Sequence, residues 1–220
     1  MEIQSCEKTG PNFSLDTYLA ARKTCIEAVN AIIKKIEPGM SEKVGQSLIK
    51  EVFKDYDVKK FWHPSKFRIS SDTVKSFSET PDHTLLCEEG DICYLDVGPI
   101  INQHEADYGR SFVIGNGSRE RHALVQASET IFLNTAKYWK QERKSGKDLF
   151  EFANDQAISL GYVLNPKMAG HRLGDFPHKV FSSEKLFKFQ QVPVENLWVL
   201  EIHVIDESNQ RGAFFEDILY

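Results

Sequence analysis

The chain has 220 residues, with 41% hydrophobic, 11% aromatic and 27% charged residues and a formal net charge of -5. This composition is typical of a soluble globular protein and too apolar for a disordered one. The acidic balance argues against a general nucleic-acid binder, which usually presents a basic face. No apolar run reaches the length of a membrane helix, and the first residues lack the order of a signal peptide, so we expect a cytoplasmic protein. In that reducing compartment the cysteines are expected to be free thiols: Cys6, Cys25, Cys87 and Cys93.

Two helices are predicted in the N-terminal part of the chain. Apolar residues recur every three or four positions in residues 14–36, which is typical of an amphipathic helix, and Pro38-Gly39 ends it. Ser41 is expected to cap a second helix. Residues 60–78 then read as irregular strand and turn.

Residues 92–114 read as two paired strands around two carboxylates, Asp96 and Asp107. A buried, unpaired carboxylate loses its hydration, and two of them on neighbouring strands repel each other unless a cation or a shared proton lies between them. A metal site is one interpretation of this pattern. In the alternative interpretation, Asp96 and Asp107 lie in turns, or they contact Arg110 or backbone amides.

The second half repeats the order of helices and strands. Helices are predicted over residues 119–143 and 147–160, with Gly161 as the residue that follows the second, and strands over residues 196–205 and 212–220. This order predicts an α+β fold of two similar halves, with helices on one face of a shared sheet. It excludes the regular β-α alternation and the glycine-rich loop of a dinucleotide-binding fold.

Three further candidate metal ligands lie in strand-like segments of the second half: His171, Glu201 and Glu216. Together with the two earlier carboxylates they form a ligand set of four carboxylates and one imidazole. Such a set suits Mn²⁺, Fe²⁺, Co²⁺ or Zn²⁺ in a two-metal site better than a thiolate zinc site.

These five residues resemble, in order and approximate spacing, the five metal ligands of the pita-bread (M24-type) metallopeptidases. That family includes the methionine aminopeptidases, aminopeptidase P and prolidase. The resemblance runs from about residue 14 to the C-terminus and is carried by the segments DVGPIINQHEADYGRSF and GHRLGDFPH. The segments GHRLG and FFED are most similar to the aminopeptidase P and creatinase-like branch, and the chain as a whole resembles the aminopeptidase P and prolidase-like branch.

The resemblance implies a fold and a domain organisation. We expect one pita-bread catalytic domain over residues 1–220, with residues 1–12 as a lead-in and no separate N-terminal domain. Its two pseudo-symmetric halves would share a curved, mainly antiparallel sheet with helices on the outer face. Full-length aminopeptidase P and prolidase carry an N-terminal domain that shapes the substrate pocket, so a different substrate preference is expected here.

The resemblance also implies how two divalent ions would be held, with manganese preferred over cobalt, iron or zinc. Asp96 would chelate the first ion, His171 and Glu201 would hold the second, and Asp107 and Glu216 would bridge the two. A metal-bridged hydroxide would be the nucleophile.

Two residues would act on the substrate as well. Glu201 would take the proton of the nucleophile and help to deliver it to the leaving amine, and His178 would hydrogen-bond the scissile carbonyl or its oxyanion.

The chain departs from the family pattern at several positions. Phe77 aligns with a substrate-binding histidine of active members, and a phenylalanine donates no proton. His63, next to Pro64, and His83 are out of register, and a structural role is favoured for His63. His203 follows Glu201 at two-residue spacing and would line the cavity or bond a neighbouring strand. Arg172 would bind a substrate carboxylate or, in the favoured reading, pair with Asp175 or Glu105.

The leading hypothesis is a metallopeptidase that cleaves an N-terminal residue or a dipeptide, with Xaa-Pro specificity favoured over methionine removal. The alternative is a pseudo-peptidase that acts as a binding module, which the substitution at Phe77 favours. Hydrolysis of another C–N bond, as in creatinase relatives, ranks last because the creatinase branch normally lacks the five metal ligands. The expected partner is a small peptide, with no nucleic acid and no membrane, and a homodimer is left open.

Overall fold

The computed structural model describes residues 7–220, so Cys6 and part of the predicted lead-in lie outside the described residues. The helices are α1 (Leu15–Ile33), α2 (Glu42–Asp55), α3 (Arg119–Glu142) and α4 (Gly146–Ser159), with short 3₁₀ turns η2 (Ser70–Val74) and η3 (Leu186–Lys188). The strands of the first half are β1 (Lys60–Phe61), β2 (Lys66–Ile69), β3 (Ile92–Val97), β4 (Pro99–Ile101), β5 (His104–Glu105) and β6 (Tyr108–Val113). Those of the second half are β7 (Val163–Leu164), β8 (His171–Arg172), β9 (Trp198–Asp206) and β10 (Arg211–Ile218).

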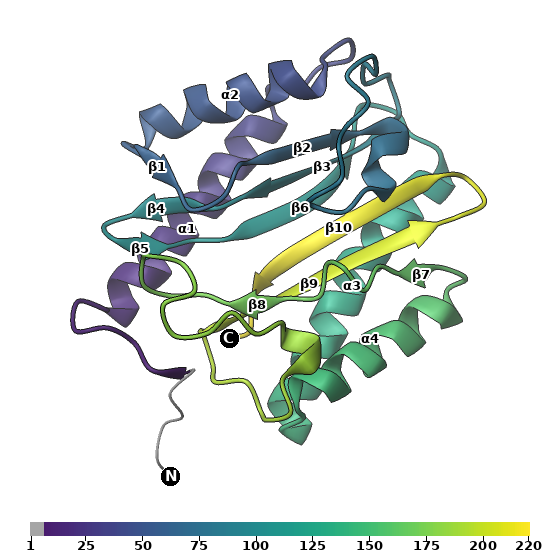
Figure 1. Ribbon diagram of the computed structural model, residues 1–220. Coiled ribbons are helices and arrows are strands. Elements are labelled where there is room, and N and C mark those ends of the chain that lie inside the picture. Colours follow the sequence, from purple (N-terminus) through teal and green to yellow (C-terminus); the bar gives the residue numbers. More distant parts are fainter. Residues whose placement is uncertain (1–6) are drawn as a thin grey trace.

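The described strands form a seven-stranded antiparallel sheet and a three-stranded one (Figure 1). The large sheet has the order β2-β3-β6-β10-β9-β7, with β8 paired to β9. Strands β2, β3 and β6 come from the first half of the chain and the others from the second half. The two halves therefore meet at the β6–β10 pairing, which lies in the interior of the sheet.

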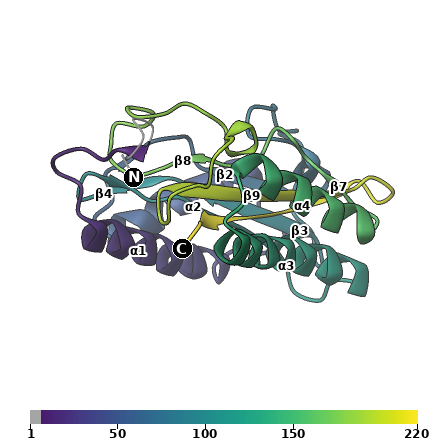
Figure 2. The same ribbon diagram turned by 90° about the horizontal axis from the view of Figure 1, so that it is seen from below.

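Helices α1 and α3 run along one face of the large sheet, and long loops cover the other face (Figure 2). Helix α3 contacts β9 and β10, α1 contacts β6, α2 contacts β2, and α4 packs on α3. The apolar stripes predicted for these helices form the core, where Cys25, Ile32, Ile131 and Trp139 are almost fully buried. This arrangement confirms the α+β fold expected from the sequence, in which two halves share one sheet with helices on one face.

The ends of the helices follow their capping residues. The side chains of Ser14, Ser41 and Ser118 accept hydrogen bonds from backbone N–H groups in the first turns of α1, α2 and α3. Such caps satisfy N–H groups that have no partner within the helix. Gly161, after α4, has a φ of 82°, a value that glycine adopts without steric cost.

The segment between β3 and β6 differs from the simple ribbon predicted for residues 92–114. Strands β4 and β5 form an additional hairpin, which β1 joins to make the small sheet. Its turn places Asn102 and Gln103 at positive φ angles of 48° and 62°. Polar side chains tolerate this conformation better than β-branched ones do.

Two further sequence predictions concern thiols and membranes. Cys25, Cys87 and Cys93 are free, as expected. Among residues 7–220, we find no helix with the length and apolar character needed to span a bilayer.

Candidate metal centre

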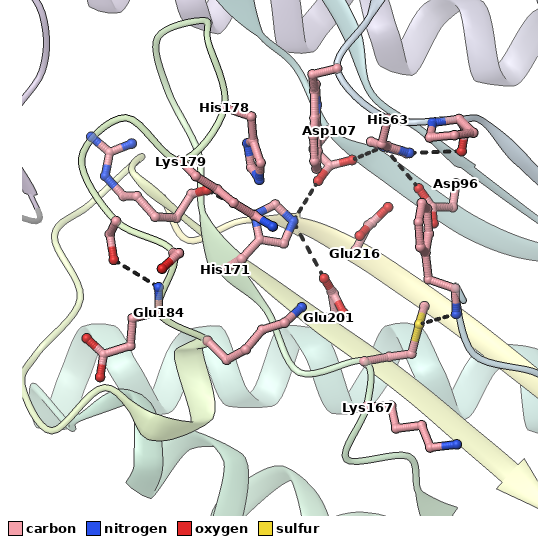
Figure 3. Close-up of a pocket in the computed structure, with 18 residues that line it drawn as sticks. His63, Asp96, Asp107, Lys167, His171, His178, Lys179, Glu184, Glu201 and Glu216 are labelled. Atoms are coloured by element: carbon pink, nitrogen blue, oxygen red, sulfur yellow. Dashed lines mark hydrogen bonds and ion pairs between the residues drawn. The ribbon is translucent and has the colours of Figure 1, made fainter. Parts of the chain in front are cut away.

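All five predicted metal ligands line one pocket on the sheet face opposite α1 and α3. The pocket has a volume of about 300 Å³. Figure 3 shows their side chains turned toward a common centre. The five residues are Asp96 on β3, Asp107 just before β6, His171 on β8, Glu201 on β9 and Glu216 on β10.

Strand register explains why residues so far apart in sequence meet here. Asp96 is paired with Gly109, Gly109 with Glu216, and Glu216 with Glu201. Four neighbouring strands thus carry one transverse row of residues. Because paired residues across a sheet point to the same face, this row brings the three carboxylates to one side.

Gly109 is the member of this row without a side chain, and its lack of a Cβ leaves space for the carboxylate of Glu216 in the pocket. A Cβ at this position would lie 2.6 Å from Oε1 of Glu216 and 2.9 Å from the carbonyl oxygen of Leu95. Any larger residue would push the Glu216 carboxylate aside. The absent side chain leaves the space in which Asp96 and Glu216 face each other.

Each half of the site contains one imidazole beside carboxylates. His171 Nε2 lies 3.1 Å from Oδ2 of Asp107 and 3.6 Å from Oε1 of Glu201. His63 Nε2 lies 3.4 Å from Oδ1 of Asp96 and 3.4 Å from Oδ1 of Asp107. Asp107 therefore contacts a histidine with each of its two oxygens.

Burial of several carboxylates together perturbs their ionisation. Burial, with Asp107 and Glu201 nearby, raises the pKa of Asp96 to about 6, although His63 opposes the shift. Burial and the charges of Asp107 and Asp96 raise the pKa of Glu216 well above its usual range. Burial also acts on Asp107, but hydrogen bonds from His171 and His63 hold its pKa below the usual value. Burial lowers the pKa of His63, but Asp96 and Asp107 raise it to about 9, and Asp107 and Glu201 likewise raise the pKa of His171. Without a metal ion, the cluster therefore retains protons that offset its negative charge.

A divalent cation fits this cluster. Oε1 of Glu216 is buried and has no hydrogen-bond partner within residues 7–220, although such an atom normally has one. His63, Asp96 and Asp107 each place a ligand atom within 4.8 Å of the others. Carboxylate oxygens and imidazole nitrogens are the ligands that Mn²⁺, Fe²⁺, Co²⁺ and Zn²⁺ accept.

His178 lines the same pocket. Its ring stacks on that of Trp62 with centroids 3.9 Å apart, and its Nδ1 lies 2.9 Å from Oε2 of Glu105. Burial and the nearby His171 lower the pKa of His178 to about 3. Burial and the charge of Asp107 raise the pKa of Glu105 to about 9. At neutral pH both groups are therefore uncharged.

The structure changes the interpretation of two histidines. The prediction that His203 lines the cavity is wrong, because its side chain is fully buried and bonded to the Thr73 carbonyl oxygen at 2.8 Å and to Asn165 at 3.1 Å. His63, for which a structural role was favoured, lies inside the pocket instead. Its position in an irregular segment before β2 offered no periodicity from which to infer this contact.

Phe77 and Arg172 also line the pocket. The Phe77 ring meets His63 edge-on at 5.4 Å, and the ammonium group of Lys66 lies 4.3 Å from its centroid. Arg172 donates a hydrogen bond to the carbonyl oxygen of Lys8 at 2.9 Å. Its expected ion pair with Asp175 or Glu105 is absent from the ion pairs of the described residues.

Comparisons with known proteins match the sequence of this chain to metallopeptidases. Residues 16–220 match the sequence model described as Metallopeptidase family M24. The chain is 27% identical over 154 residues to methionine aminopeptidase 2 of Bacillus subtilis, an alignment that covers 66% of this chain and 60% of that protein. The chain thus spans less than two thirds of this curated relative.

Solved structures show the same fold at lower sequence identity. A prolidase from Pyrococcus horikoshii superimposes with a TM-score of 0.77 and 17% identity, covering 96% of this chain and 59% of that one. A methionine aminopeptidase from Thermotoga maritima superimposes with a TM-score of 0.75 and 18% identity, covering 96% of this chain and 93% of that one. These likenesses establish the fold and leave the substrate to be inferred from the site.

Proposed function

Because the chain belongs to metallopeptidase family M24, we propose that it is a dinuclear metal-dependent hydrolase that cleaves a peptide bond near the N-terminus of a peptide or dipeptide. The observation that carries the proposal is the convergence of five potential ligands on one pocket, with Oε1 of Glu216 left without a hydrogen-bond partner among the described residues. Four buried carboxylates without a compensating cation would destabilise the core.

We assign the ligands as the sequence resemblance implies. Asp96 would hold the first ion, His171 and Glu201 the second, and Asp107 and Glu216 both. When bound, the ions would supply an acidified water molecule and polarise the substrate carbonyl. In support of bridging by Asp107, its two oxygens face histidines on opposite sides.

Glu201 is the residue we propose as the proton carrier. Its carboxylate lies on the pocket wall, and Oε1 is 3.6 Å from His171 Nε2. From this position it can accept a proton from the attacking water and return it to the leaving amine.

His178 is the residue we propose to bind the substrate carbonyl. Since Glu105 and His178 are both uncharged at neutral pH, the carboxylic acid can donate its proton to Nδ1, which leaves the imidazole proton on Nε2. The ring points into the pocket (Figure 3), so this N–H can donate to a carbonyl oxygen or to the oxyanion that forms from it. Trp62 covers one face of the ring and fixes its plane.

For specificity we retain Xaa-Pro substrates as the leading candidate, since the chain as a whole resembles the aminopeptidase P and prolidase-like branch and a prolidase shares the fold. Removal of N-terminal methionine is the second candidate, and the curated methionine aminopeptidase relative favours it. A pseudo-peptidase is the third, because Phe77 stands in the pocket where a proton donor was expected.

A peptide panel separates these candidates. Xaa-Pro and Met-Xaa peptides would be incubated with the protein and Mn²⁺, Co²⁺ or Zn²⁺, with metal content measured on the same samples. We expect turnover that a chelator abolishes and that Glu201→Gln eliminates while the fold is kept. Two bound ions without turnover on any peptide would favour the pseudo-peptidase, and a protein that binds no metal would refute the proposal.

A further inference from the structure

We propose that His63 is a sixth protein ligand of this centre and holds the first metal ion together with Asp96 and Asp107. The inference deepens the proposed function and rests on it for the presence of metal. It gives each ion one imidazole, from His63 on one side and from His171 on the other. The ligand set would then be four carboxylates and two imidazoles.

The distances also suit a shared ion, since the hydrogen bond from His63 to Asp107 is long. His63 Nε2 is 3.4 Å from Oδ1 of Asp96 and 3.4 Å from Oδ1 of Asp107. Both separations exceed the roughly 2.7–3.2 Å of a good N–H···O hydrogen bond. An ion with bonds of about 2.0–2.1 Å to tetrahedrally arranged ligands separates the ligand atoms by about 3.3–3.4 Å. Both His63 separations therefore match ligands of one ion, and the ligand atoms of His63, Asp96 and Asp107 all lie within 4.8 Å of one another.

The hydrogen bond on the other side of the ring orients Nε2 as a ligand. His63 Nδ1 lies 3.0 Å from the carbonyl oxygen of Pro64. A carbonyl oxygen only accepts, so Nδ1 carries a proton. Nε2, which faces the two carboxylates, is the nitrogen that can bind a metal ion in place of its own proton. Metal-ligating histidines commonly make this second contact, which fixes their tautomer.

His171 has the same arrangement in the other half of the site. Its Nδ1 lies 3.0 Å from the carbonyl oxygen of Arg172, again the residue that follows it. Its Nε2 faces Asp107 and Glu201. The two histidines thus present the same nitrogen to the shared carboxylate, Asp107, from opposite sides.

The segment that carries His63 is held against the site. The backbone N–H of Trp62 donates to the carbonyl oxygen of Gly98 at 2.9 Å, and its indole N–H donates to that of Ala106 at 3.0 Å. A Cβ on Gly98 would lie 2.3 Å from Cδ2 of His63. The side chain of His63 is only 8% exposed. A ligand needs such restraint, because metal geometry tolerates little displacement.

This assignment changes the expected metal. A ligand from His63 adds a second nitrogen to the site, so that each ion has one imidazole. Compared with the five-ligand set, the six-ligand set therefore favours zinc, cobalt and iron over manganese.

The test is a metal titration of apoprotein variants. Wild type, His63→Gln, His171→Gln and the control His83→Gln, which changes an exposed histidine outside this pocket, would be titrated with Zn²⁺ and Co²⁺ by calorimetry. We expect wild type and the control to bind two ions. His63→Gln should bind one ion as before and the other at least tenfold more weakly. Retention of that one ion also establishes that the variant folds.

Two results would overturn the inference. If His63→Gln binds both ions with unchanged affinity and an unchanged cobalt spectrum, His63 is no ligand, even if KM or kcat alters. If wild type binds no metal, the proposed function fails as well, which distinguishes that outcome from the first.

Discussion

Oε2 of Glu105 lies 2.9 Å from Nδ1 of His178, and both groups are uncharged at neutral pH. Glu105 therefore acts as a neutral donor that fixes the tautomer of His178. Glu105→Gln keeps a donor, the amide N–H, at this position, so we expect kcat/KM to remain within a few-fold of wild type. Glu105→Ala should lower kcat by about 10²-fold, the usual effect of losing one oxyanion donor.

The measurement is steady-state kinetics on the best peptide of the panel, with metal content determined for each variant. Equal activity of Glu105→Gln and Glu105→Ala at full metal content would show that Glu105 does not position His178.

Metal binding should become weaker at acidic pH. In the metal-free protein, burial raises the pKa of Asp96 from 3.8 to about 6. Its contribution to stability is therefore fully present below pH 3.8 and is lost as pH rises through about 6. An ion binds the carboxylate form and restores stability there, so the increase in Tm on adding metal should grow between pH 5 and pH 7.

At a free metal concentration about 100 times Kd the gain is about 2.7 kcal/mol, or roughly 5–10 °C in Tm. Thermal unfolding with Zn²⁺ and with a chelator at pH 5, 6 and 7 measures it. An equal increase in Tm at all three values would contradict the assignment of Asp96 as a ligand.

Phe77→His tests whether the pocket lacks a proton donor. The Phe77 ring lies on the pocket wall, 5.4 Å from the ring of His63, so an imidazole there would bring an N–H close to a bound substrate. We expect Phe77→His to raise kcat/KM for the best peptide by about tenfold, the lower part of the range for a positioned acid or base.

Phe77→Leu is the matched control, because it keeps an apolar side chain of similar reach. If both variants change the activity equally, the effect is one of shape, and the alignment of Phe77 with the family histidine is unsupported.

Arg22 and Asp217 form a buried ion pair that links α1 to the end of β10. Arg22 Nε donates to Oδ1 of Asp217 at 2.6 Å, and the side chains are 19% and 6% exposed. Arg22→Met leaves the carboxylate buried without its cation, which should reduce the free energy of unfolding by about 3 kcal/mol. The double variant Arg22→Met/Asp217→Leu should recover much of that loss.

Urea unfolding provides the comparison, with Lys23→Met as the control. Lys23 is on the same helix but 78% exposed, and its pair with Glu27 is 3.8 Å long, so a change within about 0.5 kcal/mol is expected. A loss from Arg22→Met no larger than that of the control would show that the pair contributes little.

The parts of this structure that could be predicted from sequence are those governed by local pattern. Ser14 and Ser41 marked helix starts because a serine side chain caps free backbone N–H groups. The predicted strands that contain Glu201 and Glu216 form β9 and β10, where the two residues are paired. Both residues are flanked by apolar side chains, which predict a buried strand. A carboxylate in a buried strand needs a compensating partner, so its presence there indicated a functional site.

The parts that could not be predicted depend on which loop covers which face. Strand alternation places His203 on the same face as Glu201, yet Thr73 in η2 and Asn165 cover that portion of the face and bond the imidazole. His63 reaches Asp96 because Gly98 leaves room for its ring. Neither contact has a local signal, since each depends on residues distant in the chain.

The central place of β10 in the sheet has a consequence for how the protein is made. A ribosome synthesises β10 after every other element described, yet β10 lies between β6 and β9 and supplies Glu216. Until it emerges, β6 and β9 each present an open edge, and the carboxylate cluster lacks one member. The ligand set proposed above can therefore be completed only after β10 has been synthesised, because Glu201 and the earlier ligands precede it in the chain.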